Sequence, residues 1–227
     1  MKNKKLLIYG IGETAEIAYE YFTHDSEYEV CGFVVDKEFL EKDKMFELPV
    51  ISFEKVDQIY SSDEFYMYAA ATYNKLNRVR TLMYNKAKEK NYRMASYISS
   101  KAFVWHNVSI GDNVMILENN VIQTNVNIGN NVILWSGNHV GHRSTIEDNV
   151  YVSSHCVISG FCVIKKYSFL GVNCTFNDQI TLAEDNIVAS GALIRKNSEK
   201  GNLLVGSPGR VAPKTSYDVF NVTEEWI

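Results

Sequence analysis

The sequence lacks the features that mark nucleic-acid-binding and membrane proteins. It has no excess of positive charge, because 23 Lys and Arg residues stand against 27 Asp and Glu residues, for a formal net charge of −4. This balance argues against a nucleic-acid partner. No apolar run approaches the roughly 18 residues that a membrane-spanning helix needs, so no membrane association is expected.

Signal-peptide features are also missing, and cysteines are few. The basic N-terminal residues are followed by only a short apolar run, Leu6–Tyr9, which is too short for the apolar region of a secretory signal. We therefore expect a cytoplasmic protein. Its 4 cysteines are expected to be reduced in that compartment.

The first part of the chain alternates short apolar runs with helical patterns. Residues 6–9, 30–35 and 65–71 are apolar runs that we expect to form buried strands. Apolar residues at helical spacing follow the first and third runs: Ile17, Ala18, Tyr21 and Phe22, then Leu76, Val79, Leu82 and Met83. Strand, helix and strand at these intervals indicate βαβ units and a small parallel sheet.

A period of six residues replaces this pattern near residue 98. Every sixth residue from Val104 to Ile194 is large and apolar, and a second series four residues later holds mostly small or β-branched residues. Such hexapeptide periodicity is typical of a parallel β-helix, in which three short strands form one coil. The length of the series predicts about five coils, spaced by about 4.8 Å.

Residues one coil apart are expected to stack along the axis of this helix. The step of eighteen residues places Cys156 next to Cys174. These thiols are close enough in principle for a disulfide, but their place in the small-residue series and a reducing compartment favour free cysteines in the core. Another predicted column consists of His106, Thr124, His142, Gly160 and Asp178.

The chain resembles the hexapeptide-repeat sugar acyltransferases of the PglD and NeuD family, which act on bacillosamine-type sugars and sialic acid. The resemblance rests on Asn138–Ser144, Ser159–Gly160, Phe169–Asn173 and the stretch from Leu182 to Arg210. It implies an α/β N-terminal domain followed by a left-handed parallel β-helix. We therefore expect a Rossmann-like nucleotide-sugar-binding domain in residues 1–97, the acyltransferase β-helix in 98–213 and a C-terminal tail in 214–227.

The resemblance also implies an activity. Members of this family transfer acetyl from acetyl-CoA to the amino group of a nucleotide-linked amino sugar, for cell-surface glycan biosynthesis. They need no metal, and they commonly associate as homotrimers with sites at the subunit boundaries. Acetyl-CoA is thus the expected co-substrate, and a nucleotide-linked amino sugar is the expected acceptor.

His142 and Gly160 are the catalytic candidates that the resemblance implies. A histidine at the position of His142 is the general base in the family, and an imidazole can accept a proton at neutral pH. The backbone N–H of Gly160 would stabilise the oxyanion of the tetrahedral intermediate. The predicted column places Gly160 one coil, about 4.8 Å, from His142.

The binding residues follow from the same resemblance. Contacts with CoA are expected at Val172, Ser190, Gly191, Lys196 and Pro208. Contacts with the nucleotide sugar are expected in the turn after the first strand and at the end of the second, that is, at Gly10, Gly12, Glu13, Thr14 and Asp36. A lone G-x-G is a weak phosphate-binding signal, whereas an acidic residue after the second strand of a dinucleotide fold binds a ribose hydroxyl.

Two departures from the family leave questions open. Arg143 stands where the family has a carboxylate that orients the histidine, and a guanidinium cannot accept the imidazole N–H. Either Glu147 or Asp178 takes over this role, within or across subunits, or the amine arrives unprotonated and needs little help. The turn from Gly10 to Thr14 also differs from the family's usual turn, so the identity of the acceptor cannot be transferred.

Three alternatives remain at this point. The first is a sugar O-acetyltransferase on the same fold. The second is a zinc enzyme of the γ-carbonic-anhydrase type, which needs three histidines at a subunit boundary, although the spacing of His139, His142 and His155 does not match that family. The third is a non-catalytic hexapeptide scaffold, which would not bind acetyl-CoA.

Overall fold

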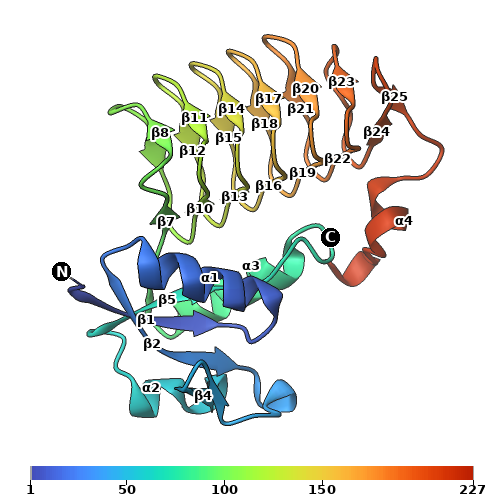
Figure 1. The fold of residues 1–227 in the computed structure, drawn as a ribbon. Helices are drawn as coiled ribbons and strands as arrows, with labels where there is room; N and C mark the ends of the chain where they lie inside the picture. Colours follow the sequence, from blue (N-terminus) through green and yellow to red (C-terminus); the bar gives the residue numbers. More distant parts are fainter. Residues whose placement is uncertain (1, 227) are drawn as a thin grey trace. The chain divides into compact units, whose positions relative to one another are not determined.

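The structure is a computed structural model that describes residues 2–226, and the chain forms two compact units in it (Figure 1). The first comprises the residues up to Thr72 together with Arg80–Tyr97, and the second comprises Tyr73–Val79 and the residues from Ile98 onward. The sequence pattern had assigned residues 73–79 to the N-terminal domain; the structure instead places them with the repeats. Among the described residues, no helix is long and apolar enough to span a lipid bilayer.

The first unit contains a six-stranded sheet in the order β3-β4-β2-β1-β5-β6. Its strands are β1 (Lys4–Tyr9), β2 (Tyr28–Val35), β3 (Lys44–Met45), β4 (Leu48–Ser52), β5 (Phe65–Ala69) and β6 (Arg93–Met94). All neighbours pair in parallel except β3 and β4. The predicted small parallel sheet is therefore confirmed. Chain order reverses between β1 and β5, and ligands of open α/β sheets bind at the carboxyl ends of strands at such a point.

Helices lie on both faces of this sheet because its strands are apolar on both faces. The helical elements are α1 (Glu13–His24), η1 (Lys37–Phe39), η2 (Phe53–Lys55), α2 (Val56–Ile59) and α3 (Arg78–Glu89). Leu7 and Tyr9 of β1 pack with Val56 of α2 and Tyr84 of α3. Phe22 of α1 packs on the aromatic rings of the other face, including Tyr68 at 5.2 Å.

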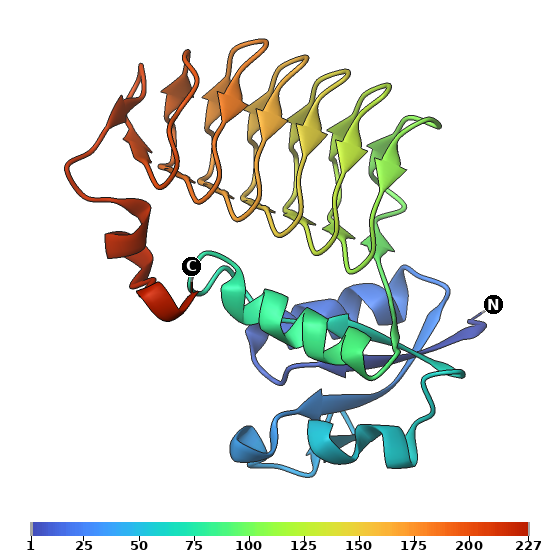
Figure 2. The ribbon, with the colours of Figure 1, turned by 180° about the vertical axis from the view of Figure 1, so that it is seen from behind.

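The second unit is the predicted left-handed parallel β-helix, and Figure 2 shows its ladder of coils from behind. Three sheets run along it, and two-residue strands build most of them. The first sheet contains β7 (Tyr97–Ile98), β10 (Met115–Ile116), β13 (Ile133–Leu134), β16 (Tyr151–Val152), β19 (Phe169–Leu170), β22 (Ile187–Val188), β24 (Leu203–Val205) and β25 (Arg210–Val211). The second contains β8 (Phe103–Val104), β11 (Val121–Ile122), β14 (His139–Val140), β17 (Val157–Ile158), β20 (Thr175–Phe176) and β23 (Leu193–Ile194). The third contains β9 (Ser109–Ile110), β12 (Asn127–Ile128), β15 (Thr145–Ile146), β18 (Val163–Ile164) and β21 (Thr181–Leu182).

The register of the coils is the predicted one. Paired residues of neighbouring strands are eighteen positions apart, as in Val121 with His139 and Val140 with Ile158. The hexad residues from Ile116 to Ile194 point inward and form one continuous core. All four cysteines are free, and Cys156 and Cys174 are buried in this core, as expected from the small-residue series.

A left-handed backbone conformation recurs at every corner of the coils. From Asn113 to Gly191, every sixth residue has a positive φ. Asparagine, aspartate and glycine adopt this conformation at the least cost. They fill nine of these positions: Asn113, Asn119, Asn125, Asn131, Gly137, Asn149, Asn173, Asp185 and Gly191. The six-residue repeat of the sequence therefore places Asn, Asp or Gly at most of the corners, where the backbone turns.

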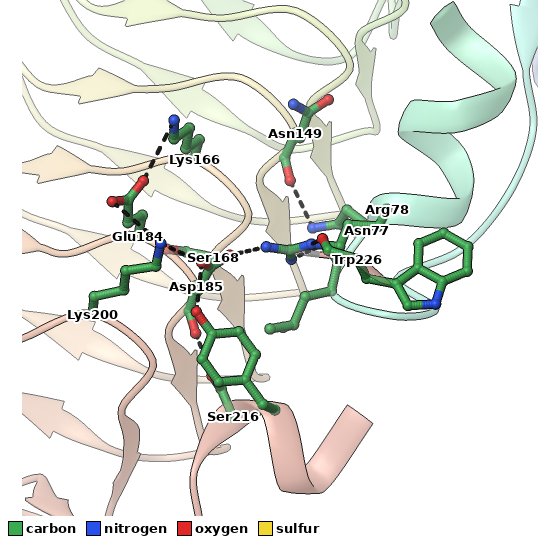
Figure 3. A network of polar contacts seen from close by, with 12 residues as sticks. Asn77, Arg78, Asn149, Lys166, Ser168, Glu184, Asp185, Lys200, Ser216 and Trp226 are labelled. Carbon is green, nitrogen blue, oxygen red and sulfur yellow. Dashed lines mark hydrogen bonds and ion pairs between the residues drawn. The ribbon is translucent and has the colours of Figure 1, made fainter. Parts of the chain in front are cut away.

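A polar network fixes residues 73–79 and the C-terminal segment on the β-helix (Figure 3). Arg78 forms an ion pair of 2.6 Å with Asp185, and their side chains are only 8% and 3% exposed. Its guanidinium also lies 4.3 Å above the Tyr167 ring. Tyr217 of α4 (Ser216–Phe220) donates to Asp185 at 2.7 Å, and the main-chain carbonyl of Trp226 in η3 (Glu224–Trp226) accepts from Arg78. This network explains why residues 73–79 belong to the second unit.

Replacement of Asp185 is expected to destabilise the β-helix unit strongly. Asp185→Gly leaves the Arg78 guanidinium buried without its carboxylate, at a cost of about 3–5 kcal/mol in the free energy of unfolding. Glycine also accepts the positive φ of 61° at this position, so backbone strain does not confuse the result. Urea denaturation checks this, with Glu184→Ala as the matched control. Glu184 forms only longer, surface ion pairs with Lys166 and Lys200, so a similar loss in the control would contradict the expectation.

Candidate functional site

His142 lies on an exposed corner between the second and third sheets. Its backbone N–H donates to the Gln123 side chain at 2.9 Å. Its ring stands edge-on to the Phe161 ring, with centroids 5.1 Å apart and an interplanar angle of 80°. No hydrogen bond reaches the imidazole from within residues 2–226.

Gly160 lies directly beside this imidazole in the next coil. A Cβ atom on Gly160 would be 2.7 Å from His142 Cε1 and 3.1 Å from both ring nitrogens. The predicted column is therefore confirmed for this pair. A glycine is required here because any larger residue would displace the ring.

The Gly160 amide is not free, which the sequence did not indicate. Its N–H donates to Asp178 Oδ1 at 2.8 Å. The same bond recurs at another corner of the coils, where the Asn130 N–H donates to Asp148 Oδ1 at 2.6 Å. Asp178 thus has an ordinary structural role in the ladder of coils, and an oxyanion could use the Gly160 amide only after Asp178 moves away.

The two carboxylates expected to orient His142 are used elsewhere within the chain. Glu147 accepts from the backbone N–H of Lys166 at 3.1 Å, and Asp178 accepts from Gly160. Phe161 is the side chain that contacts the imidazole ring. The Arg143 guanidinium lies 5.9 Å from the centre of the same Phe161 ring.

Residues that disfavour the left-handed conformation gather at this corner. Arg143, Phe161 and Gln179 have φ of 57°, 56° and 62° at successive coils, where other corners mostly carry asparagine or glycine. A left-handed conformation costs an ordinary residue about 1–2 kcal/mol. Strain that is retained in this way tends to cluster at functional sites. This independent observation points to the same corner as His142.

Relief of this strain gives a stability test. Arg143→Asn is expected to raise the free energy of unfolding by about 1 kcal/mol, because asparagine tolerates the positive φ and the exposed guanidinium makes few contacts. Urea denaturation measures the change. Gln179→Asn, two coils further along the same row, is a second test of the same strain, and its free energy of unfolding should rise by a similar amount. An unchanged or lower stability in both variants would show that the corner is not strained.

The five residues expected to contact CoA fall into two groups. Val172 and Ser190 stack one coil apart at the corner between the first and second sheets, and the Gly191 N–H donates to the Val172 carbonyl at 2.8 Å. Lys196 and Pro208 line a different feature, a cavity of about 560 Å³ at the C-terminal end of the repeats. One chain therefore does not bring all five together.

The cavity has walls of two kinds. Arg195 and Lys196 supply cations that can bind phosphate groups, and Ile194, Leu204 and Val211 supply apolar surface. Strand pairing of β20 with β23 continues the step of eighteen residues. Lys196 therefore occupies the row of His142, Gly160 and Asp178, three coils or about 14 Å beyond His142.

The first unit carries the residues expected to bind the nucleotide sugar. Gly10 has a φ of 134°, and a Cβ there would lie 2.5 Å from the Ala70 carbonyl oxygen, so glycine is required where β1 passes the end of β5. Gly12 is the N-cap of α1, and no side chain caps this helix. Thr14 is half-buried and Glu13 exposed in the first turn. Uncapped backbone N–H groups at a helix N-terminus can bind an anion.

Asp36 follows β2 at the same edge of the sheet, and its carboxylate is fixed. Oδ1 accepts from the Tyr9 hydroxyl at 2.7 Å and forms an ion pair of 2.9 Å with Lys86 of α3. Burial and the hydrogen bond to Asp36 raise the pKa of Tyr9, which keeps its hydroxyl protonated as a donor. Asp36 and Lys86 line a cavity of about 440 Å³ together with Lys37, Glu38 and Glu54.

The three histidines considered for zinc do not converge within one chain. His139 is half-buried and faces outward on β14, while His142 lies at the corner that follows it. The His155 ring lies over Gly137 at a corner on the opposite edge of the second sheet. Within residues 2–226, no group of three or more His, Cys, Asp or Glu side chains is arranged to hold a metal ion.

Sequence reasoning missed several residues of these sites. Phe161 and Gln123 contact His142, and Tyr9 and Lys86 hold Asp36. The sequence could have indicated Phe161, because it occupies one of the positions, six residues apart, that mostly hold asparagine or glycine. Lys86 carried none, because it lies 50 positions from Asp36.

Comparisons with known proteins agree with the repeat architecture. The family model of the GMPPB C-terminal domain matches residues 93–203. A curated relative, the mitochondrial gamma carbonic anhydrase 1 of Arabidopsis thaliana, is 32% identical over 75 residues, or 32% of this chain and 27% of that protein. The chain thus matches about a quarter of that relative's length.

Solved structures resemble nearly the whole chain. A mutant of perosamine N-acetyltransferase from Caulobacter crescentus, in complex with CoA and GDP-perosamine, has a TM-score of 0.81 at 18% identity, covering 92% of this chain and 97% of that one. The acetyltransferase domain of PglB from Neisseria gonorrhoeae, in complex with acetyl coenzyme A, has a TM-score of 0.82 at 21% identity, covering 92% and 100%. WeeI from Acinetobacter baumannii has a TM-score of 0.77 at 17% identity, with the same coverage. At these identities the likeness establishes a shared fold.

Proposed function

We propose that the protein is an acetyltransferase that moves acetyl from acetyl-CoA to the amino group of a nucleotide-linked amino sugar in cell-surface glycan biosynthesis. The observation that carries the proposal is the exposed imidazole of His142 beside Gly160, at a corner whose backbone is kept strained. Structures of the same fold include an N-acetyltransferase in complex with CoA and a nucleotide sugar, which supports this substrate class.

In the proposed reaction, the amino nitrogen of the sugar attacks the thioester carbonyl. A C–N bond forms, the C–S bond breaks, and the proton lost by the amine passes through His142 to the leaving sulfur. The Gly160 amide donates to the oxyanion once Asp178 has released it. Phe161 positions the imidazole in place of the missing carboxylate.

The row from His142 to Lys196 fits acetyl-CoA. Arg195 and Lys196 bind its phosphates, and the apolar wall of the same cavity packs against the rest of the nucleotide end. The pantetheine arm then extends along the row to bring the thioester to His142. Val172, Ser190 and Gly191 contact the acetyl-CoA of a neighbouring subunit, because they lie at the other edge of the second sheet.

We include a homotrimer in the proposal. Three outward-facing residues of the second sheet are exposed and apolar: Phe103, Val121 and Val157, at 52%, 38% and 38%, with His139 between Val121 and Val157 in the same row. Such a row is typical of a surface that another protein surface covers. Light scattering on the purified protein is expected to give three times the chain mass, and a monomer at working concentration would contradict this part of the proposal.

The acceptor is proposed to bind to residues 1–97, and a substrate panel tests the function as a whole. The purified protein is incubated with acetyl-CoA and with UDP-, GDP- and dTDP-linked 3- and 4-amino sugars, and thiol release is followed. We expect release with at least one amino sugar and an amide in the product. An ester product would indicate the O-acetyltransferase instead. No release and no binding of acetyl-CoA would favour the scaffold.

Replacement of Asp178 shows whether its carboxylate competes with the oxyanion for the Gly160 amide or supports the general base. Asp178→Ala is expected to raise kcat by about three- to tenfold, because the oxyanion no longer competes with a carboxylate for the Gly160 amide, a gain of about 1 kcal/mol. A loss of tenfold or more would show instead that Asp178 supports the base. Steady-state kinetics measure the change. Asp148→Ala, which removes the same kind of ladder bond at a different corner from that of His142, is the matched control and should leave kcat unchanged.

A further inference from the structure

We propose that Asp36 makes the acceptor site selective for ribonucleotides over 2′-deoxyribonucleotides, an inference that rests on the proposed function. One oxygen of this carboxylate is held within the protein, and the other faces a cavity as an acceptor for a ribose hydroxyl. The acceptor sugar is then linked to a ribonucleoside diphosphate rather than to dTDP.

Asp36 lies close to the turn after β1, Gly10–Thr14, which is expected to bind the nucleotide. It directly follows β2, and β2 pairs in parallel with β1, whose end leads into Gly10. The Gly10 N–H donates to the Val34 carbonyl at 2.8 Å, which fixes the turn against the end of β2. In dinucleotide-binding sheets an acidic residue at this place accepts from the ribose 2′-hydroxyl.

The carboxylate is rigid before any ligand binds. The Tyr9 ring is buried and stacks on Phe53 with centroids 4.7 Å apart, so its hydroxyl is a fixed donor to Oδ1. The Lys86 ammonium contacts the same oxygen at 2.9 Å. Two donors on one oxygen set the orientation of the whole group. Fixed groups of this kind lose little entropy on binding.

The second oxygen, Oδ2, is open. Among the described residues it has no hydrogen-bond partner, and the Asp36 side chain remains 20% exposed. The cavity of about 440 Å³ beside it carries two further carboxylates, Glu38 and Glu54, against Lys37 and Lys86. Three carboxylates against two ammonium groups disfavour a phosphate there and favour a neutral group with hydroxyl donors. A ribose fits this chemistry, with the phosphates at the α1 N-terminus.

The selectivity comes from Asp36 Oδ2, which accepts a hydrogen bond from the 2′-hydroxyl of a ribose but has no such donor when a deoxyribose binds. A hydrogen bond from a hydroxyl to a carboxylate is among the stronger neutral-to-charged contacts. Removal of the 2′-hydroxyl is therefore expected to weaken nucleotide binding by about 10- to 100-fold.

The test is calorimetric titration of the full-length protein with the pairs UDP and dUDP, and GDP and dGDP, and with dTDP. We expect the ribonucleotide of at least one pair to bind about 10- to 100-fold more tightly. Asp36→Ala should abolish the difference, while Tyr9→Phe and Lys86→Met should reduce it. Lys90→Met is the matched control, because Lys90 directly follows α3 and pairs with Asp57 outside the cavity. This variant should prefer the ribonucleotide as strongly as the wild-type protein does.

The outcomes separate this inference from the proposed function. Equal affinity within both pairs, or a preference that survives in Asp36→Ala, overturns the selectivity and leaves the acetyltransferase proposal intact. Tighter binding of dTDP than of UDP and GDP also overturns it. Failure of all these nucleotides to bind overturns the inference together with the nucleotide-linked acceptor. Circular dichroism of each variant excludes loss of folding as the cause.

Discussion

Replacement of His142 by alanine is expected to lower kcat by at least about 100-fold, with little change in the KM for acetyl-CoA. Removal of a general base typically has an effect of this size, and it acts on the chemical step rather than on binding. Steady-state kinetics with the best amino sugar of the panel measure both constants. His142→Asn should behave similarly, because an amide cannot accept the proton.

The pH profile makes this result specific to a base. In the wild-type protein, kcat/KM should rise with pH as the general base loses its proton, and this ascending limb should vanish in His142→Ala. His106→Ala is the matched control, because His106 is also exposed in the same column but lies two coils away from His142. A loss of tenfold or less, worth under about 1.4 kcal/mol, would show that the amine arrives neutral. Full activity with an unaltered profile would remove His142 from the mechanism, and His139 would be the next candidate.

Gly160→Ala is expected to lower kcat by about 30-fold or more without a large loss of stability. The added methyl group would meet His142 Cε1 at 2.7 Å, so the imidazole must rotate away. The backbone of Gly160 does not have a positive φ, so alanine itself is not strained there. Kinetics and urea denaturation of the same preparation measure the two effects separately.

A double variant tests whether this loss passes through the histidine. If the methyl group acts by displacing the imidazole, Gly160→Ala should cost little further activity in the His142→Ala background, because contacting residues are not additive. Full additivity would indicate that Gly160 acts through its amide alone. A free energy of unfolding lowered by more than about 3 kcal/mol would point to disruption of the coils instead.

The repeat half of the fold was predictable in detail because each coil meets the same environment. Hexad residues such as Val140 and Ile158 are buried by other hexad residues of the coils above and below, so one period fixes the register of every strand. The step of eighteen residues then brought His142 to Gly160 without any long-range guess. The use of the Gly160 amide by Asp178 and the contacts of Phe161 and Gln123 with His142 were missed, since periodicity does not show where a side chain points.

The details of the first unit and of its connection to the repeats depend on tertiary contacts that no local sequence pattern shows. β3 and β6 were missed because they are two-residue strands at the edges of the sheet, and β4 (LPVIS) was missed because it is not a continuous apolar run. Helix α3 was expected to include Leu76, but Leu76 has a φ of 51° and is buried within the second unit, and the helix begins at Arg78. The ion pair of Arg78 with Asp185 joins residues 107 positions apart. Such pairs are decided by tertiary packing and carry no sequence period.

The row that joins His142 to Lys196 gives the β-helix a property that irregular folds lack. Each coil is a unit of fixed length, so the distance between two positions in a row is a whole number of coil rises of about 4.8 Å. Insertion of one eighteen-residue coil between Gly160 and Lys196 would lengthen this row by one rise and leave every corner and core contact of the repeat intact. If acetyl-CoA lies along this row as proposed, the number of coils between His142 and Lys196 sets the length that its pantetheine arm must span.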